Sequence, residues 1–177
     1  DIVALLYKLR LKSPVFSTRP EFRIDMPDDS VYRQDSHQDF PYGQSSINSV
    51  TIWTPLHDVD RLNGTIQVIP GSHLDGLRET EVLLNPRRFQ IKGEIELSLY
   101  KDVEIPYGCS VVFSQFLIHR SGVNTSGRPR LSFQGRFADV CCKHFQQKSF
   151  FSPDKNNTQV LNYPSKESIK KLFELID

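Results

Sequence analysis

Residues 130–139, RLSFQGRFAD, alternate polar and apolar side chains, and this period of two predicts a β-strand. Similar runs, rich in valine, isoleucine, phenylalanine and threonine, recur along the chain. They are EFRIDM (21–26), SVTIWTPL (49–56), GTIQVIPG (64–71), IELSLY (95–100) and CSVVFSQFLIH (109–119). Turn-forming residues such as LNG at 62–64 and SGRP at 126–129 separate the runs. Many short strands with few helices predict a mainly β fold, either a sandwich, a jelly roll or a small barrel.

Helical patterns are expected only beside this β region. The opening DIVALLYKLRLKSP (1–14) has the apolar spacing of a short amphipathic helix that ends before Pro14. The final PSKESIKKLFELID (164–177) predicts a second helix with Ser165 as its N-cap. The polar segment 74–94 predicts a long loop or insertion with a short helical piece, which could act as a lid. A length of 177 residues fits one domain over residues 1–177.

Composition argues against several classes of partner. The chain has 22 lysine and arginine residues against 21 aspartate and glutamate residues, a net charge of +1, so we expect no nucleic-acid or anionic membrane partner. No apolar run reaches the roughly 18–20 residues of a membrane helix, and no signal-peptide pattern is present. Three cysteines without a Cys-x-x-Cys spacing argue against a disulfide scaffold or a zinc ribbon. They suit a reducing compartment, and we expect a cytoplasmic protein.

The pair His37 and Asp39 is the first candidate for a metal site. Residues two apart in a strand face the same side, so both could point to a common ion while Gln38 turns away. The remaining histidines are candidates for a third ligand: His57, His73, His119 and His144. His119 is preferred because it ends the most apolar predicted strand. Two histidines and one carboxylate with open positions are typical of non-haem Fe(II) oxygenases.

Arg130 follows His119 by 11 residues and opens the next predicted strand. A guanidinium buried beside an iron site needs an anion, and a dicarboxylate co-substrate would supply one through a bidentate contact. Ser121 could donate a hydrogen bond to the same carboxylate. Arg128 precedes Pro129 in a turn, so we expect it to be exposed and Arg130 to be buried.

Four stretches, in this order, resemble the phytanoyl-CoA dioxygenase family over about residues 20–140. They are HQD (37–39), SVTIWTPL (49–56), NGTIQVIPGSH (63–73) and HRSGVNTSGRPR (119–130). The resemblance implies a double-stranded β-helix (jelly roll, cupin-like) with a few flanking helices. It also implies Fe(II)- and 2-oxoglutarate-dependent oxygenase activity, with O2 as the oxidant.

The resemblance also implies roles for individual residues. The iron ligands would be His37, Asp39 and His119. Arg130 and Ser121 would hold the distal carboxylate of 2-oxoglutarate, Trp53 would lie near the co-substrate, and Gln38 would touch co-substrate or substrate. Trp53 is equally well explained as a core aromatic residue. Arg23 is expected to make a polar contact near the iron, and Arg33 and Arg136 are expected to be surface or pocket-lining residues.

Two features depart from the family pattern. Little of the helical N-terminal part is present, and Arg120 stands where glycine is common. Asp39 keeps the carboxylate that related halogenases replace by a small residue. The expected reaction is therefore hydroxylation of an aliphatic C–H bond of a small-molecule substrate, releasing succinate and CO2. The alternatives are a non-catalytic metal-binding jelly-roll module and a cupin-type sugar isomerase; the three ligands together with Arg130 favour the oxygenase.

Overall fold

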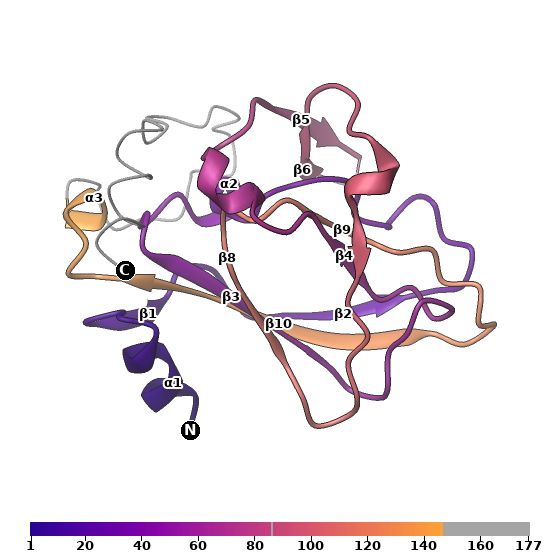
Figure 1. The fold of residues 1–177 in the computed structure, drawn as a ribbon, viewed down its shortest axis with the longest axis horizontal. Coiled ribbons are helices and arrows are strands. Elements are labelled where there is room, and N and C mark those ends of the chain that lie inside the picture. The colour runs from indigo at the N-terminus through magenta and orange to yellow at the C-terminus, as the bar shows by residue number, and fades with distance from the viewer. Residues whose placement is uncertain (86, 147–177) are drawn as a thin grey trace.

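The computed structural model describes residues 1–85 and 87–146, and strands dominate it (Figure 1). In chain order the elements are α1 (Ile2–Lys8), β1 (Pro14–Phe16), β2 (Glu21–Asp25), α2 (Phe40–Gly43), β3 (Ser49–Pro55), β4 (Ile66–Val68), the 3-10 helix η1 (Ser72–Asp75), β5 (Thr80–Leu84), β6 (Arg87–Ile91), the 3-10 helix η2 (Leu97–Leu99), β7 (Lys101–Asp102), β8 (Val111–Ser114), β9 (His119–Ser121), β10 (Arg130–Asp139) and α3 (Lys143–Gln146). No helix in this described part combines the length and apolarity needed to cross a bilayer.

Two antiparallel sheets form the body of the fold. The larger is five-stranded, in the order β1-β10-β3-β8 with β2 also paired to β10, and the smaller is three-stranded, in the order β7-β4-β9. The main core cluster lies between them: Trp53 and Phe113 come from the larger sheet, and Ile66 comes from the smaller one. Such a pair of packed sheets agrees with the predicted jelly-roll class.

Strand β10 is the longest strand and pairs with β1, β2 and β3. The predicted alternation is present only in its first half, since residues 135–139 are all buried, and much of what the strand buries is polar. Arg130, Ser132 and Arg136 are 1–3% exposed, whereas Phe133 is 43% exposed. This strand therefore carries two arginines into the interior, where each needs an anionic partner.

The apolar run 109–119 is split rather than continuous. β8 ends at Ser114, the chain turns, and β9 begins at His119. The buried side chain of Gln115 stabilises this turn by donating to the carbonyls of Val50 and Phe137, at 3.3 and 3.4 Å. The run passes from the larger sheet to the smaller one, so the single strand predicted for it is wrong.

Two further predictions are corrected. Residues 95–100 contain η2 instead of a strand, with Leu97 and Leu99 67% and 48% exposed, so the apolar alternation there does not mark a buried face. Within the segment 74–94, the strands β5 and β6 form an antiparallel hairpin, which lies at the top of Figure 1. Phe89 and Ile91 of β6 are buried, so the hairpin packs on the body and is not a plain loop.

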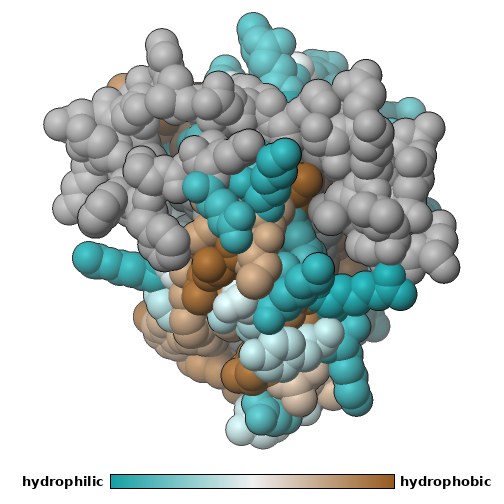
Figure 2. Space-filling view, turned by 90° about the vertical axis from the view of Figure 1, so that its left-hand side faces the viewer, coloured by the Kyte–Doolittle hydropathy of each residue, from teal (hydrophilic) through white to brown (hydrophobic). Residues whose placement is uncertain are grey.

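Helix α1 confirms the short helix predicted before Pro14, but the predicted apolar face is mostly exposed, at Ile2, Val3 and Leu5. Its N-cap is Asp1, whose carboxylate accepts from the amide of Val3 at 2.9 Å, and Leu6 is its buried residue. The space-filling view of this side of the molecule shows hydrophobic surface among hydrophilic side chains (Figure 2). The helix predicted over 164–177 lies outside the described residues.

Candidate metal centre

His37 and His119 lie opposite each other across an antiparallel bridge. The backbone amide of each donates to the carbonyl of the other, at 2.9 Å from His37 and 3.0 Å from His119. Their imidazole rings are adjacent, with centroids 4.1 Å apart. Because His119 begins β9, the smaller sheet holds one histidine and the bridge holds the other.

Each histidine ring is oriented by a carbonyl two residues earlier in the chain. Nδ1 of His37 lies 2.7 Å from the carbonyl oxygen of Asp35, and Nδ1 of His119 lies 3.0 Å from that of Leu117. These contacts favour the tautomer with its proton on Nδ1, which leaves a lone pair on Nε2. Burial lowers the pKa of His37 to about 3 and also lowers the pKa of His119. Both rings are therefore neutral at pH 7 and can act as nitrogen ligands.

Asp39 completes the cluster from the N-cap position of α2, where it is fully buried. Its Oδ1 lies 3.8 Å from Nε2 of His37, and its Oδ2 lies 3.8 Å from Nε2 of His119. The three potential ligand atoms lie within 4.8 Å of one another. Within residues 1–85 and 87–146, no other cluster of three or more histidine, cysteine or acidic side chains is close enough to hold a metal.

The chain reaches this geometry by a different route from the strand predicted for residues 37–39. His37 forms an isolated bridge, and the chain then enters α2 at Phe40. The amide of Phe40 donates to the carbonyl of Gln115 at 3.0 Å, and its ring stacks on Phe116 with centroids 4.7 Å apart. These contacts anchor the start of α2 and place Asp39 beside the histidines. The two residues converge as predicted, but the strand given as the reason is absent.

Gln38, between the two candidate ligands, contacts three backbone groups. Its amide nitrogen donates to the carbonyls of Gly76 and Phe116, at 2.8 and 2.6 Å, and its oxygen accepts from the amide of Arg78 at 2.8 Å. These bonds tie the candidate centre to the segment after η1 and to the turn before β9. They give Gln38 an anchoring role, and its contact with the co-substrate stays a prediction.

Arg136 is a residue of this centre whose role sequence reasoning missed. It is 3% exposed, and its Nη2 lies 2.9 Å from Oδ1 of Asp39 while its Nη1 donates to Glu21 at 3.0 Å. The guanidinium also lies over the ring of Tyr42, 4.8 Å from the centroid. A signal was available: Arg136 follows Arg130 by an even number of residues on one predicted strand, so both share a face.

The electrostatics of Asp39 are set by these neighbours. Burial alone would raise its pKa, but the Arg136 guanidinium together with the imidazoles of His119 and His37 outweighs that effect and holds the pKa below its ordinary value. Thr51 donates its hydroxyl to Oδ2 at 2.6 Å. Oδ1 has the Arg136 ion pair but no hydrogen bond of regular geometry. The carboxylate is therefore ionised, oriented, and still able to bind a cation through Oδ1.

A second cluster forms around Arg130, which is 2% exposed. Its Nη2 lies 3.5 Å from the hydroxyl of Ser121, and its guanidinium lies 5.5 Å from the ring centroid of Trp53. Three predicted co-substrate residues are thus brought together, and Arg128 is exposed as expected. The expectation that only an external anion would pair with Arg130 is wrong, because Oδ2 of Asp25 lies 2.8 Å from its Nη2.

The two clusters are built from the same strands. On β3, Thr51 contacts Asp39, and Trp53, two residues later, lies against Arg130. On β9, His119 belongs to the candidate metal centre, and Ser121, two residues later, contacts Arg130. Residues two apart on a strand share a face. Both clusters therefore lie on the same faces of β3 and β9, two residues apart along each strand.

The other candidate residues have partners away from the metal cluster. His57 accepts through Nε2 from the amide of Leu131 at 3.0 Å. Arg120, the departure after His119, donates to Gln67 at 2.7 Å and lies over the ring of Tyr100. His73 and His144 are not part of the metal-binding group.

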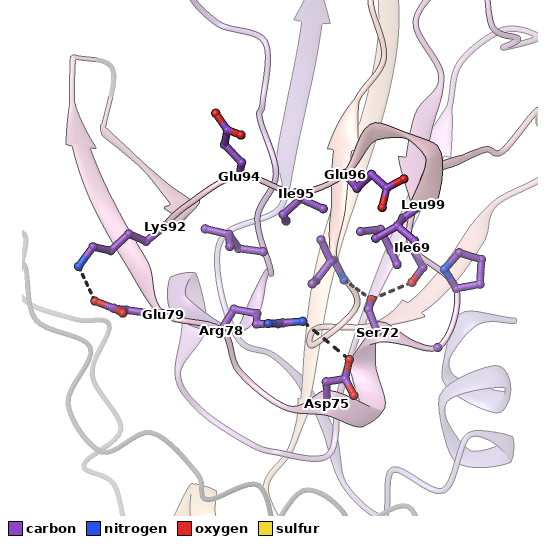
Figure 3. Close-up of a pocket in the computed structure, with 14 residues that line it drawn as sticks. Ile69, Ser72, Asp75, Arg78, Glu79, Lys92, Glu94, Ile95, Glu96 and Leu99 are labelled. Carbon is purple, nitrogen blue, oxygen red and sulfur yellow. Dashed lines mark hydrogen bonds and ion pairs between the residues drawn. The ribbon is translucent and has the colours of Figure 1, made fainter.

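A separate hollow of about 630 Å³ opens between η1, the start of the β6–η2 connection and η2 (Figure 3). Its apolar lining includes Ile69, Ile91 and Ile118, and charged side chains such as Glu94 and Glu96 lie around it. None of the predicted iron or co-substrate residues lines this hollow. It is therefore distinct from the candidate metal centre.

Known proteins share this sequence pattern and this fold. A family model described as phytanoyl-CoA dioxygenase (PhyH) matches residues 6–132. Phytanoyl-CoA dioxygenase, peroxisomal, from Bos taurus is 31% identical over 132 residues, covering 68% of this chain and 39% of that protein. The protein of the same name from Homo sapiens is 29% identical over 136 residues, covering 71% of this chain and 40% of that protein. The chain thus spans about two fifths of the length of these relatives.

Solved structures confirm the fold class. The epimerase SnoN in complex with Fe3+, alpha ketoglutarate and nogalamycin RO aligns with a TM-score of 0.60 and 21% identity, covering 78% of this chain and 55% of that chain. EvdO2 from Micromonospora carbonacea var. aurantiaca, complexed with 2-oxoglutarate, aligns with a TM-score of 0.57 and 20% identity, covering 69% of this chain and 54% of that chain. At these identities the likeness establishes the jelly-roll architecture. With the family model matching most of its length, the chain belongs to the phytanoyl-CoA dioxygenase family.

Proposed function

We propose that this protein is an Fe(II)- and 2-oxoglutarate-dependent oxygenase that hydroxylates an aliphatic C–H bond of a small-molecule substrate. The observation that carries the proposal is the adjacency of a His-Asp-His cluster and a buried arginine cluster on the same faces of β3 and β9. Iron, 2-oxoglutarate and O2 would supply the oxidising chemistry, with succinate and CO2 as the other products. Family membership supports the same reading.

The donor set suits a ferrous ion. Two imidazole nitrogens and one carboxylate on one side are the ligands typical of non-haem Fe(II) oxygenases, whereas calcium and magnesium prefer oxygen ligands only. His37, His119 and Asp39 would hold the metal through Nε2 atoms and a carboxylate oxygen. Oδ1 of Asp39, which lacks a regular hydrogen bond, is suited to that contact.

Charge balance favours an anionic co-substrate with two carboxylates. Asp39, Arg136 and Glu21 together carry one net negative charge, so a bound dication would leave one positive charge. Around Arg130, the guanidinium groups of Arg130 and Arg23 share one carboxylate, Asp25, which also leaves one positive charge. Each end of 2-oxoglutarate would therefore meet one uncompensated positive charge.

The residues of the chain would position the reactants and exclude water. Thr51 and Arg136 hold the Asp39 carboxylate, and the carbonyls of Asp35 and Leu117 hold the histidine rings. The three candidate ligands are at most 6% exposed, which keeps bulk water away from their donor atoms. Trp53 offers its ring face to the Arg130 guanidinium and would limit its movement.

Hydroxylation is the proposed outcome because Asp39 retains its carboxylate. The bovine and human relatives are named as dioxygenases, and the structural relative SnoN is named as an epimerase. A non-catalytic module with the same ligands would bind metal but consume no 2-oxoglutarate.

Succinate formation tests the proposal. Protein supplied with Fe(II), 2-oxoglutarate and ascorbate should release succinate, slowly without substrate and faster when a metabolite library supplies the correct one. His37→Ala and Asp39→Ala proteins should fall to the level without enzyme, whereas Arg128→Ala, an exposed control, should match the parent. Folded parent protein that loads with metal but makes no succinate under any condition would support the non-catalytic module.

We also propose that residues 1–177 form one jelly-roll domain that acts in the cytoplasm on a small molecule, with no nucleic-acid or membrane partner. All three cysteines are free, which supports a reducing compartment.

A further inference from the structure

We propose that Asp25 competes with the co-substrate for Arg130 and thereby sets the affinity of the protein for 2-oxoglutarate. The inference rests on the proposed function, in which Arg130 binds the distal carboxylate. Asp25 would then determine affinity without itself touching the metal or the oxidised substrate.

Strand β2 places Asp25 beside Arg130. The two residues are direct partners in the β2–β10 register, and Oδ2 of Asp25 lies 2.8 Å from Nη2 of Arg130. Asp25 is 9% exposed and Arg130 is 2% exposed, so solvent screens their interaction weakly. Burial alone would raise the pKa of Asp25, but Arg130 and Arg23 outweigh it and hold the pKa below its ordinary value. The carboxylate is therefore charged at neutral pH.

Arg23 also binds the carboxylate of Asp25. Its Nη2 donates to Oδ1 of Asp25 at 2.7 Å and to the carbonyl of Tyr32 at 3.2 Å. Its Nε also donates to Oδ2 of Asp25 at 3.5 Å, so Oδ2 is shared between Arg23 and Arg130 while Oδ1 is held by Arg23. Asp25 therefore does not form a two-point contact with Arg130 in this arrangement.

Arg130 keeps unused donor capacity. Its Nε is buried and has no hydrogen-bond partner, although its Nη2 is engaged by Asp25 and Ser121. A guanidinium binds a carboxylate best through two parallel bonds. An incoming carboxylate can therefore bind Arg130, but the negative charge of Asp25 on the same guanidinium weakens that binding.

Two substitutions, one at Asp25 and one at Arg23, should shift the affinity for 2-oxoglutarate in opposite directions. Asp25→Asn keeps the size and one oxygen acceptor for Arg130 but removes the competing charge. Arg23→Gln removes the cation that draws Asp25 away, so Asp25 is left to neutralise Arg130 alone. A purely structural role for this network predicts instead that both variants bind 2-oxoglutarate less tightly.

The measurement is calorimetric titration of 2-oxoglutarate into Ni(II)-loaded protein. Ni(II) stands in for Fe(II), so that 2-oxoglutarate binds without being consumed. We expect Asp25→Asn to bind about tenfold more tightly than the parent, the effect of removing one nearby charge. Arg23→Gln should bind several-fold more weakly. In an Arg130→Gln background, Asp25→Asn should leave the affinity unchanged. Asp102→Asn, at an exposed acid on β7, controls for the change in overall charge.

The outcomes separate the inference from the proposed function. A folded, Ni(II)-loaded parent that does not bind 2-oxoglutarate overturns both. A second outcome is that the parent binds 2-oxoglutarate and Arg130→Gln weakens that binding, while Asp25→Asn binds no more tightly than the parent. That result overturns only the role of Asp25. Thermal unfolding checks each variant. Should Asp25→Asn fail to fold, Arg23→Gln is measured in its place, and unchanged or tighter binding of 2-oxoglutarate in that variant overturns the role of Asp25.

Discussion

Replacing Arg136 by glutamine should destabilise the metal-free protein strongly. The guanidinium is 3% exposed and lies 2.9 Å from Asp39 and 3.0 Å from Glu21. Asp39 is fully buried, so the substitution leaves a charge there without its cationic partner. Breaking such a buried pair costs about 3–5 kcal/mol of unfolding free energy. The Glu21 side chain is 42% exposed, and solvent screening reduces its share to at most about 1 kcal/mol.

The assay is urea unfolding at pH 7 in the presence of a chelator, followed by circular dichroism. Arg128→Gln, at an exposed arginine of the same chain, is the matched control and should change the unfolding free energy by less than about 0.5 kcal/mol. Asp39→Asn should remove most of the penalty: in that background the Arg136 substitution should cost only about 1 kcal/mol, because no buried charge is left unpaired. A loss below about 1 kcal/mol for Arg136→Gln alone, or an equal loss in both backgrounds, would refute the assignment of Arg136 as the partner of Asp39.

Two further predictions concern the same cluster. Thr51→Val removes the hydroxyl that donates to Oδ2 of Asp39 at 2.6 Å, so we expect Ni(II) affinity to fall by about tenfold, the scale of losing a group that orients a ligand. Calorimetry measures this, and Thr54→Val, at an exposed hydroxyl pair with Ser110, is the control that should bind as the parent does. The second prediction is a loss of stability in acid without metal. Burial lowers the pKa of His37 from 6.5 to about 3, so the unfolded chain takes up a proton that the folded chain refuses as pH falls through this window. Stability due to this histidine should be intact above pH 6.5 and decline by up to about 1.4 kcal/mol per pH unit below it. A pH series of urea titrations checks this, and a flat profile between pH 6.5 and 4 would contradict it.

The parts of the fold that follow local patterns could be predicted from the sequence. β10 was recognised from its alternation, and α1 from its apolar spacing before Pro14. The split of 109–119 between two sheets could not be, because an apolar run that changes partner has the same composition as one continuous buried strand. The hairpin of β5 and β6 was missed because Glu81, Arg88 and Gln90 interrupt its apolar residues, and such a polar segment has the composition of a loop.

The candidate site likewise contains residues that could be predicted from the sequence and residues that could not. Its ligands were found because His37, Asp39 and His119 are residue types with strong metal chemistry, and their order matches a family. Arg136 and Asp25 were missed because charged residues are usually solvated, and their roles depend on which strands pair. The β2–β10 register sets Asp25 opposite Arg130, and no local pattern in either strand encodes that register.

The polar interior of β10 suggests why the site tolerates so much buried charge. Arg130 and Arg136 are buried on the same face of the strand, and β2 supplies one acid to each, Asp25 and Glu21, which share a face because they are four residues apart. Each arginine therefore has an acidic partner within the protein before any metal or co-substrate binds, although Arg130 shares Asp25 with Arg23 and one positive charge remains there. Because Arg136 also faces Asp39 and Arg130 faces Ser121, the same two strands that stabilise the arginines hold them against the candidate metal and co-substrate positions. Because β2 carries both acids, the charges that would bind ligands are positioned by the pairing of β2 with β10.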